Sequence, residues 1–170
     1  MFKFDWGGEG DHVYLITTAD ELDRILQLAD YFEKTGRSGF LIQEYVPSGR
    51  RTLRVVVIGQ TYISYWRIQP NLACFQSSLA KAAVIDTDAD PDLQHAAVAR
   101  VKAFCQETGI NLAGFDMLFA SDVKNQEALF LEINYYFGRR GLGGSARFYE
   151  ILNTEITKWI AGLGLTLGKR

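Results

Sequence analysis

Residues 128–138 read ALFLEINYYFG, an apolar segment that contains one glutamate and one asparagine and ends in a glycine. Side chains of a β-strand alternate between the two faces of a sheet, so Glu132 and Asn134 are predicted to point the same way. Leu131 and Ile133 then point to the other face. The segment therefore predicts a strand with one apolar face and one face that carries a carboxylate beside a carboxamide.

A second apolar segment, LAGFDMLFA at residues 112–120, precedes this strand and is followed by a polar turn. Pairing the two around a turn centred near Lys124 places Asp116 directly opposite Glu132, with Asn134 on the same face. Opposed carboxylates repel each other, and a hard cation such as Mg²⁺ reverses that effect because it prefers carboxylate oxygens. A solvated sheet face with two incidental acids stays open as an alternative, since a slip of one residue would separate the pair.

Composition narrows the class of protein. The 170 residues are 48% hydrophobic and 13% aromatic, which is typical of a globular chain, and the net charge of −2 gives no general attraction to nucleic acid or anionic membrane. No apolar run approaches the roughly 18 residues of a membrane span, and the first residues lack a signal-peptide pattern. Cys74 and Cys105 form no metal or disulfide motif, which favours a cytoplasmic location.

The order of the predicted elements indicates an α+β fold with a mostly antiparallel sheet and flanking helices. Helices are expected from a capping box at Thr18 and Glu21 to Gly36, from Asp90-Pro91 to Gly109, and from Ser145 as N-cap, with Phe148, Ile151 and Trp159 facing inward. Strands are expected at 2–5, 12–17, 39–46, 52–59, 61–68, 112–120 and 128–134, with one more near 82–85 in an ambiguous stretch. The strands at 52–59 and 61–68 are predicted to form a hairpin.

A glycine turn and two arginines are further candidates for anion binding. Gly7, Gly8 and Gly10 follow Lys3 closely, and glycine amides can converge on a phosphate, although a tight hairpin also collects glycines. Arg54 and Arg67 lie within apolar β segments, where an unpaired guanidinium is costly. A phosphate or a salt bridge to Asp116 or Glu132 would satisfy them equally, and both interpretations stay open.

Together these segments resemble the ATP-grasp superfamily, and most closely the branch that ligates glutamate to a ribosomal protein. FKFDWGGEGDHVYLI resembles the lysine strand and the glycine-rich flap over the triphosphate, and LIQEYV the segment between two lobes that meets the adenine. LRVVVIGQTYISYWR resembles the hairpin that carries two arginines. GFDMLF and LEIN resemble the magnesium-binding strands, with three oxygen ligands in the family's order.

The resemblance implies a role for each candidate residue. It implies Mg²⁺ ligands at Asp116, Glu132 and Asn134, and catalytic arginines at Arg54 and Arg67. It implies ATP binding by Lys3, Gly7, Gly8, Gly10, Gln43, Glu44, Tyr45, Val46 and Asn71. Arg139 and Arg140 are assigned to an acidic substrate or to the replacement of a missing arginine.

The implied activity is that of an ATP-dependent carboxylate ligase that acts through an acylphosphate. Residues 1–46 would be part of a small ATP-binding lobe and residues 47–170 a larger lobe with the metal site. The expected partners are ATP, Mg²⁺, a small-molecule or peptide carboxylate, and a nucleophilic acceptor. The alternative is a catalytically inactive nucleotide-binding module, or an interaction scaffold with the same fold.

Several positions depart from the family's pattern. Thr52 stands where the family often has aspartate, Gln69 where it has arginine, and CFQSS at 74–78 where it has glycines. The resemblance also implies that an amino-terminal substrate domain and the first strand of the small lobe are missing. The isolated chain is therefore expected to bind Mg·ATP weakly and to lack ligase turnover. The strand at 2–5 is expected to lie at an exposed edge, so that the chain either forms a homodimer through this edge or leaves residues 1–11 disordered.

Overall fold

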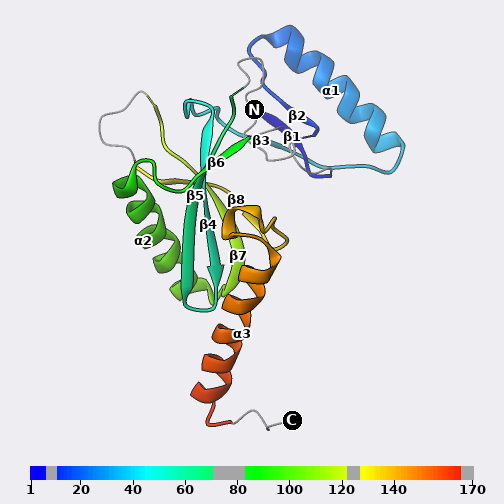
Figure 1. Ribbon diagram of the computed structural model, residues 1–170. Coiled ribbons are helices and arrows are strands. Elements are labelled where there is room, and N and C mark those ends of the chain that lie inside the picture. Colours follow the sequence, from blue (N-terminus) through cyan, green and yellow to red (C-terminus); the bar gives the residue numbers. More distant parts are fainter. Residues whose placement is uncertain (7–10, 71–82, 122–126, 166–170) are drawn as a thin grey trace.

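Two antiparallel sheets and three long helices make up the described part of the chain. The computed structural model describes residues 1–6, 11–70, 83–121 and 127–165 (Figure 1). The first sheet has the order β2-β1-β3, and the second has the order β6-β5-β4-β7-β8. The α+β, mostly antiparallel fold is therefore confirmed. The strands are β1 (Phe2–Phe4), β2 (Val13–Tyr14), β3 (Phe40–Ile42), β4 (Arg51–Ile58), β5 (Thr61–Ile68), β6 (Val84–Asp86), β7 (Leu112–Leu118) and β8 (Leu129–Asn134).

The first sheet is covered on one face by α1 (Ala19–Lys34). The capping box is present as predicted: Glu21 N–H donates to Thr18 Oγ1 at 3.2 Å, and Glu21 Oε2 accepts from the backbone N–H of Thr18. Phe2 and Phe4 of β1 are buried with Ile25 of α1 in one apolar cluster. Because strand side chains alternate, Lys3 projects to the opposite face of this sheet.

The expected edge position of β1 is wrong. Strand β1 pairs antiparallel with both β2 and β3, so it lies at the centre of its sheet, and β2 and β3 are the edges. The prediction considered only a neighbour that precedes β1, whereas the chain returns after α1 to the free side of β1. β2 and β3 are also shorter than the expected ranges 12–17 and 39–46.

The second sheet is built around the hairpin of β4 and β5, which turns at Gly59 as predicted. Strand β4 is buried on both faces. Its residues Leu53, Val55 and Val57 pack with α2 (Pro91–Thr108), and Val56 and Ile58 pack with α3 (Ser145–Gly162). The two helices accordingly lie on opposite faces of the sheet (Figure 1).

Helix α2 has the predicted boundaries. Pro91 occupies the first turn after the N-cap Asp90, and Gly109 at the C-cap adopts a left-handed conformation with φ of +74°. Within the described ranges, neither this helix nor any other is both long enough and apolar enough to cross a membrane.

Helix α3 differs from the prediction at both ends. It begins at Ser145, but its N-cap is Gly144, and no side chain caps it, so the assignment of Ser145 as N-cap is wrong. Phe148 and Ile151 are buried as expected. Trp159 is 64% exposed and does not face the core, because the second half of α3 extends past the sheet (Figure 1).

A buried glutamate joins α3 to the hairpin turn. Glu155 accepts hydrogen bonds from the backbone N–H of Gln60 at 2.7 Å and from Thr61 Oγ1 at 3.0 Å, and it pairs with Lys158 at 2.6 Å. A Cβ atom at Gly59 would lie 2.7 Å from Glu155 Cβ, so only glycine admits this approach. Lys158 and the Gln60 amide lower the pKa of the Glu155 carboxyl.

Replacing Glu155 by Gln should therefore destabilise the fold in a pH-dependent way. Because the folded pKa of Glu155 is lowered, its contribution is present above the pKa of an unfolded glutamate and disappears as pH falls through the folded value. We expect a loss of about 1 to 2 kcal/mol in unfolding free energy near pH 7. The difference from the parent should shrink below about pH 4. Urea unfolding of both proteins at several pH values measures this.

The exposed neighbour Glu150, which pairs with Arg147 on the surface, offers a matched control on the same helix. Glu150→Gln should change the unfolding free energy by less than about 1 kcal/mol. Equal effects of the two substitutions would contradict the role given to Glu155.

Candidate functional site

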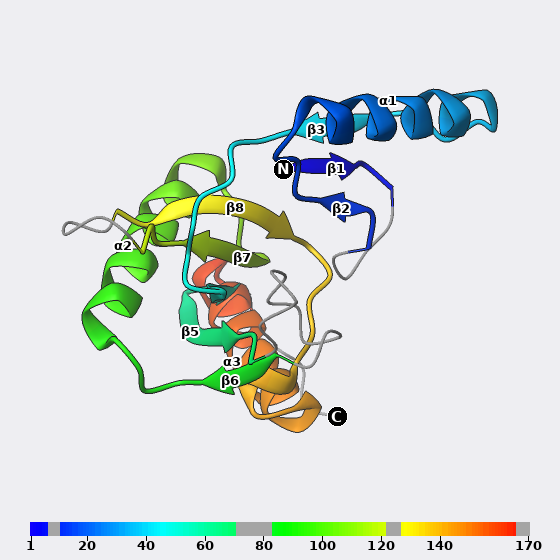
Figure 2. The same ribbon diagram turned by 90° about the horizontal axis from the view of Figure 1, so that it is seen from above.

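The α3 side of the second sheet is divided into an apolar half and a polar half. Helix α3 covers the apolar half, where Val56, Ile58 and Tyr65 are buried. The polar half lies at the other end of the same strands. The first sheet lies beyond this end (Figure 1), on the side of β8 when seen from above (Figure 2). We call the residues of the polar half the polar cluster: Thr52 and Arg54 of β4, Arg67 of β5, Asp116 of β7, and Glu132 and Asn134 of β8.

The predicted register of β7 and β8 is confirmed. Asp116 pairs with Glu132, and Gly114 pairs with Asn134, so these side chains share one face of the sheet. A bulge follows at once, because the next pair joins Met117 to Phe130. The slip of one residue that would have separated the two carboxylates is therefore excluded.

Asp116 is the centre of the polar cluster. Its Oδ1 accepts from Arg54 Nε and pairs with Arg67 Nη2 at 2.7 Å. Its Oδ2 accepts from Arg54 Nη2 at 2.9 Å and from Asn134 Nδ2 at 3.4 Å. Only 4% of Asp116 is exposed. Of the two interpretations that the sequence left open for these arginines, the structure shows the salt bridge.

The charge on Arg54 is stabilised locally. Burial disfavours the guanidinium, yet the adjacent Asp116 outweighs burial and raises the pKa of Arg54. The side chain reaches Asp116 by passing over Gly114, where an added Cβ would lie 2.9 Å from Arg54 Nη1 and 3.2 Å from Phe137 Cβ. A glycine inside a strand often marks such a close approach.

Glu132 has a different environment from Asp116. It is exposed, and among the described residues it makes no hydrogen bond or ion pair. Lys3 of the first sheet is half-buried and donates to Gln43 Oε1 at 2.8 Å. Burial lowers the pKa of Lys3, and Glu132 and Asp116 act in the opposite direction. Lys3 thus lies within electrostatic reach of both carboxylates, across the junction of the two sheets.

The residue types of the polar cluster fit a magnesium ion. Asp116, Glu132 and Asn134 share one face and supply the oxygen atoms that Mg²⁺ prefers. Asp116 is engaged by two arginines, so a cation would share this carboxylate with them or displace them. The described ranges contain no group of three or more histidine, cysteine, aspartate or glutamate side chains placed to hold a metal, and this set has two carboxylates.

The other predicted ATP-binding residues lie apart from the cluster or outside the described residues. Gln43 exchanges backbone hydrogen bonds with Met1, and its side chain holds Lys3. Glu44, Tyr45 and Val46 follow it in the link between β3 and β4, where Glu44 and Tyr45 are exposed. Gly7, Gly8, Gly10 and Asn71 lie outside the described residues.

Arg139 and Arg140 are not part of the polar cluster. Arg139 lies over the rings of Phe148 and Tyr149, at 4.5 and 4.7 Å, and donates to the Tyr149 hydroxyl at 3.1 Å. Arg140 is exposed at the start of the short helix η2 (Arg140–Leu142). Gly141 of this helix packs against the buried Tyr65, since an added Cβ would lie 2.2 Å from its ring. The sequence offered no signal for that contact.

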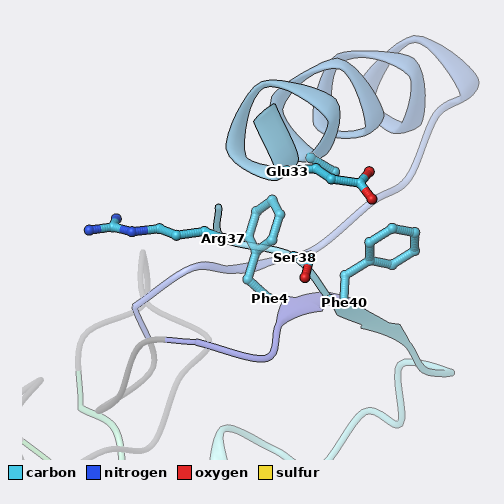
Figure 3. A pocket seen from close by; sticks show the side chains of 7 residues that line it. Phe4, Glu33, Arg37, Ser38 and Phe40 are labelled. Atoms are coloured by element: carbon cyan, nitrogen blue, oxygen red, sulfur yellow. The ribbon is translucent and has the colours of Figure 1, made fainter. Parts of the chain in front are cut away.

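A cavity of about 290 Å³ lies on the α1 side of the first sheet. Phe4 and Phe40 flank it, and Glu33 lies beside it on α1. Arg37 points away from the rings of Phe4 and Phe40 (Figure 3). Lys3 projects from the other face of this sheet. The cavity is therefore separate from the polar cluster.

Comparison with known proteins identifies the fold. The chain matches the RimK-like ATP-grasp domain family over residues 1–160. No curated protein sequence matches it. Among solved structures it is similar to the macrocyclase MdnC of Microcystis aeruginosa MRC, bound with precursor peptide MdnA, with 16% identity and a TM-score of 0.53 over 91% of this chain and 46% of that one. It also matches the macrocyclase MdnB of the same organism, with 22% identity and a TM-score of 0.36 over 91% of this chain and 48% of that one. The chain thus spans about half the length of these macrocyclases.

Replacing Asp116 by Asn should destabilise the protein strongly, because it leaves two largely buried guanidinium groups without a carboxylate. We expect a loss of about 3 to 5 kcal/mol in unfolding free energy. Asp90→Asn is the control, since Asp90 also pairs with an arginine, Arg51, but at an exposed position. It should cost less than about 1 kcal/mol. Similar losses in the two variants, measured by urea unfolding, would refute the central role of Asp116.

Gly114→Ala tests the path of Arg54. The new methyl group would push the guanidinium away from Asp116 or press against Phe137, and we expect a loss of about 1 to 3 kcal/mol in unfolding free energy. Gly138→Ala is the control, because nothing lies within 4 Å of the Cβ position there. A Gly114→Ala variant as stable as the parent in thermal unfolding would show that Arg54 does not need this space.

Proposed function

The chain belongs to the RimK-like ATP-grasp domain family, and on that premise we propose that it is the ATP-binding portion of an ATP-dependent carboxylate ligase. The observation that supports this is the shared face of Asp116, Glu132 and Asn134, with Lys3 across the junction of the two sheets. A nucleoside triphosphate with its metal requires oxygen ligands for the cation and a lysine within reach of the phosphates.

Each residue of the polar cluster except Thr52 has a role in this proposal. Asp116, Glu132 and Asn134 would hold Mg²⁺, which when bound offsets the negative charge of the phosphates. Lys3 would contact a phosphate, since its ammonium is already held by Gln43 on the face that meets the second sheet. Arg67 would stabilise the phosphoryl group in transfer, and Arg54 would support it through Asp116.

The ATP-binding residues outside the cluster belong to the same proposal. The link between β3 and β4 would meet the adenine, and the glycine-rich segment after β1 and the segment after β5 would meet the phosphates. Arg139 and Arg140 would bind an acidic substrate. The residues concerned are Gln43, Glu44, Tyr45 and Val46, then Gly7, Gly8 and Gly10, and Asn71.

The proposed reaction joins a carboxylate to a nucleophile. An oxygen of the carboxylate attacks the γ-phosphorus of ATP and ADP leaves; an amine or a similar nucleophile then attacks the acyl carbon and phosphate leaves. Preorganised donors such as Arg67 stabilise the charge that develops in such a step. The macrocyclase MdnC was solved with a precursor peptide, which makes a peptide carboxylate one candidate beside small molecules.

The proposed architecture divides the chain between two lobes. Residues 1–46 would be part of the small ATP-binding lobe and residues 47–170 the lobe that carries the metal, in a cytoplasmic protein. Because the chain spans 46% of the MdnC chain, we assign it nucleotide and metal binding, and we assign complete turnover to the longer ligase.

A nucleotide-binding module without catalysis is the second candidate. It is favoured by Gln69, which is uncharged and only 1% exposed, so the side chain is not free to meet a phosphate. Both candidates bind Mg·ATP, and only the ligase releases ADP in the presence of a carboxylate and an acceptor. Because turnover is assigned to the longer ligase, measuring ADP release by that longer protein, with a panel of peptide and small-molecule carboxylates, separates them.

Replacing Glu132 by Gln should weaken Mg·ATP binding while the fold stays intact, because the exposed carboxylate makes no structural contact among the described residues. We expect an increase in Kd of about tenfold or more, which corresponds to about 1.4 kcal/mol. Calorimetric titration with ATP in Mg²⁺ and in EDTA measures the effect, and thermal unfolding checks the fold.

Glu127→Gln is the matched control, since Glu127 is an exposed carboxylate just before the same strand and pairs with Arg100. It should leave the Kd unchanged. Parent-like Mg·ATP affinity in Glu132→Gln would remove Glu132 from the metal site, and absence of nucleotide binding by the parent chain would overturn the proposed function of this chain.

A further inference from the structure

Thr52 belongs to the polar cluster but has no part in the proposed chemistry. It lies in β4 directly opposite Arg67 of β5 and is 6% exposed. Its hydroxyl oxygen accepts from Arg67 Nε at 3.2 Å and from Arg67 Nη2 at 3.0 Å. Two nitrogen atoms of one guanidinium therefore converge on a single neutral oxygen.

The nitrogen atoms of Arg67 divide into two sets. Nε and Nη2 are engaged by Thr52, and Nη2 also pairs with Asp116 at 2.7 Å. Nη1 makes no hydrogen bond or ion pair among the described residues. Because the guanidinium is planar and rigid, contacts that hold Nε and Nη2 also set the direction of Nη1.

Thr52 and Asp116 hold Arg67 by different chemistry. Asp116 is shared with Arg54, and its negative charge would attract the cation that the cluster fits. The hydroxyl of Thr52 carries no charge, so a cation bound at Asp116 attracts it less strongly than it attracts the carboxylate. Thr52 can therefore keep its contacts with Arg67 when the carboxylate is drawn away.

We propose that Thr52 is a positioning residue that keeps the guanidinium of Arg67 in place while a cation engages Asp116, with Nη1, which has no partner among the described residues, directed to a terminal phosphate. The phosphate in this statement rests on the proposed function, whereas the hold of Thr52 on Arg67 does not. Loss of the hydroxyl should free the guanidinium without removing its charge.

The test compares Thr52→Val, which keeps the shape but removes the acceptor, with Thr52→Ser, which keeps the hydroxyl. Thr61→Val is the control, because it removes a hydroxyl from the same sheet that contacts Glu155 instead of Arg67. Nitrogen-15 NMR of the arginine side chains follows hydrogen exchange at Arg67 Nε–H. We expect exchange about tenfold faster or more in Thr52→Val, and parent-like exchange in Thr52→Ser and Thr61→Val.

A second measurement adds the ligand. Calorimetric titration with inorganic tripolyphosphate and Mg²⁺ should show binding about tenfold weaker in Thr52→Val, with affinity restored in Thr52→Ser. Thr52→Ala replaces Thr52→Val if the latter fails to unfold cooperatively. Adenosine titration should give the same result in all variants, because the proposed adenine contacts lie in the link between β3 and β4 and do not include Thr52.

The exchange measurement and the binding measurement test different parts of the proposal. Unchanged exchange at Arg67 in Thr52→Val and Thr52→Ala would overturn the positioning role, whatever the protein binds. If Thr52→Ser shows the same faster exchange or weaker tripolyphosphate binding as Thr52→Val, the positioning role is overturned too. The methyl group of Thr52, and not its hydroxyl, would then be responsible. If the parent binds neither nucleotide nor tripolyphosphate, the proposed function fails and with it the phosphate as the target of Nη1, while the exchange data still decide whether Thr52 holds Arg67.

Discussion

One buried carboxylate ties three strands of the larger sheet together. Asp116 of β7 accepts from Arg54 of β4 and pairs with Arg67 of β5, in a place where almost no water reaches the side chain. A buried charge without partners costs several kcal/mol, so none of the three residues can change alone. The same carboxylate is the proposed metal ligand. The stability of the fold and the proposed chemistry therefore both depend on the carboxylate of Asp116.

The alternation of side chains along strand β4 explains where these buried charges can lie. One face of the strand is apolar from Leu53 to Val57 and packs under α2. The other face is apolar only where α3 covers it, at Val56 and Ile58, and is polar at Thr52 and Arg54. Helix α3 is displaced towards the hairpin end, where Glu155 binds the turn. The end that α3 does not cover faces the first sheet, and Lys3 comes within electrostatic reach of the carboxylates there.

The candidate site was predictable where short-range rules apply. Alternation within a strand and a short turn were enough to place Asp116 opposite Glu132, and the register is confirmed. The partners of Arg54 were left open, because a phosphate and a carboxylate satisfy a guanidinium equally well. The role of Gly114 depends on the path of an arginine from a neighbouring strand. Its signal in the sequence was a glycine inside an apolar strand, and this has several structural meanings.

The sequence by itself determined the α+β class, the capping box of α1, the limits of α2 and the hairpin at Gly59, because these depend on residues close together in the chain. Only the tertiary structure decided that β1 lies at the centre of its sheet, because its second neighbour returns from beyond α1. It also decided that Trp159 is exposed, since helical periodicity indicates a face but not how far the sheet extends beneath it. The tertiary structure also decided that Asp116 pairs with two arginines, because a buried charge meets its counterion only when strands that are distant in the sequence pack together.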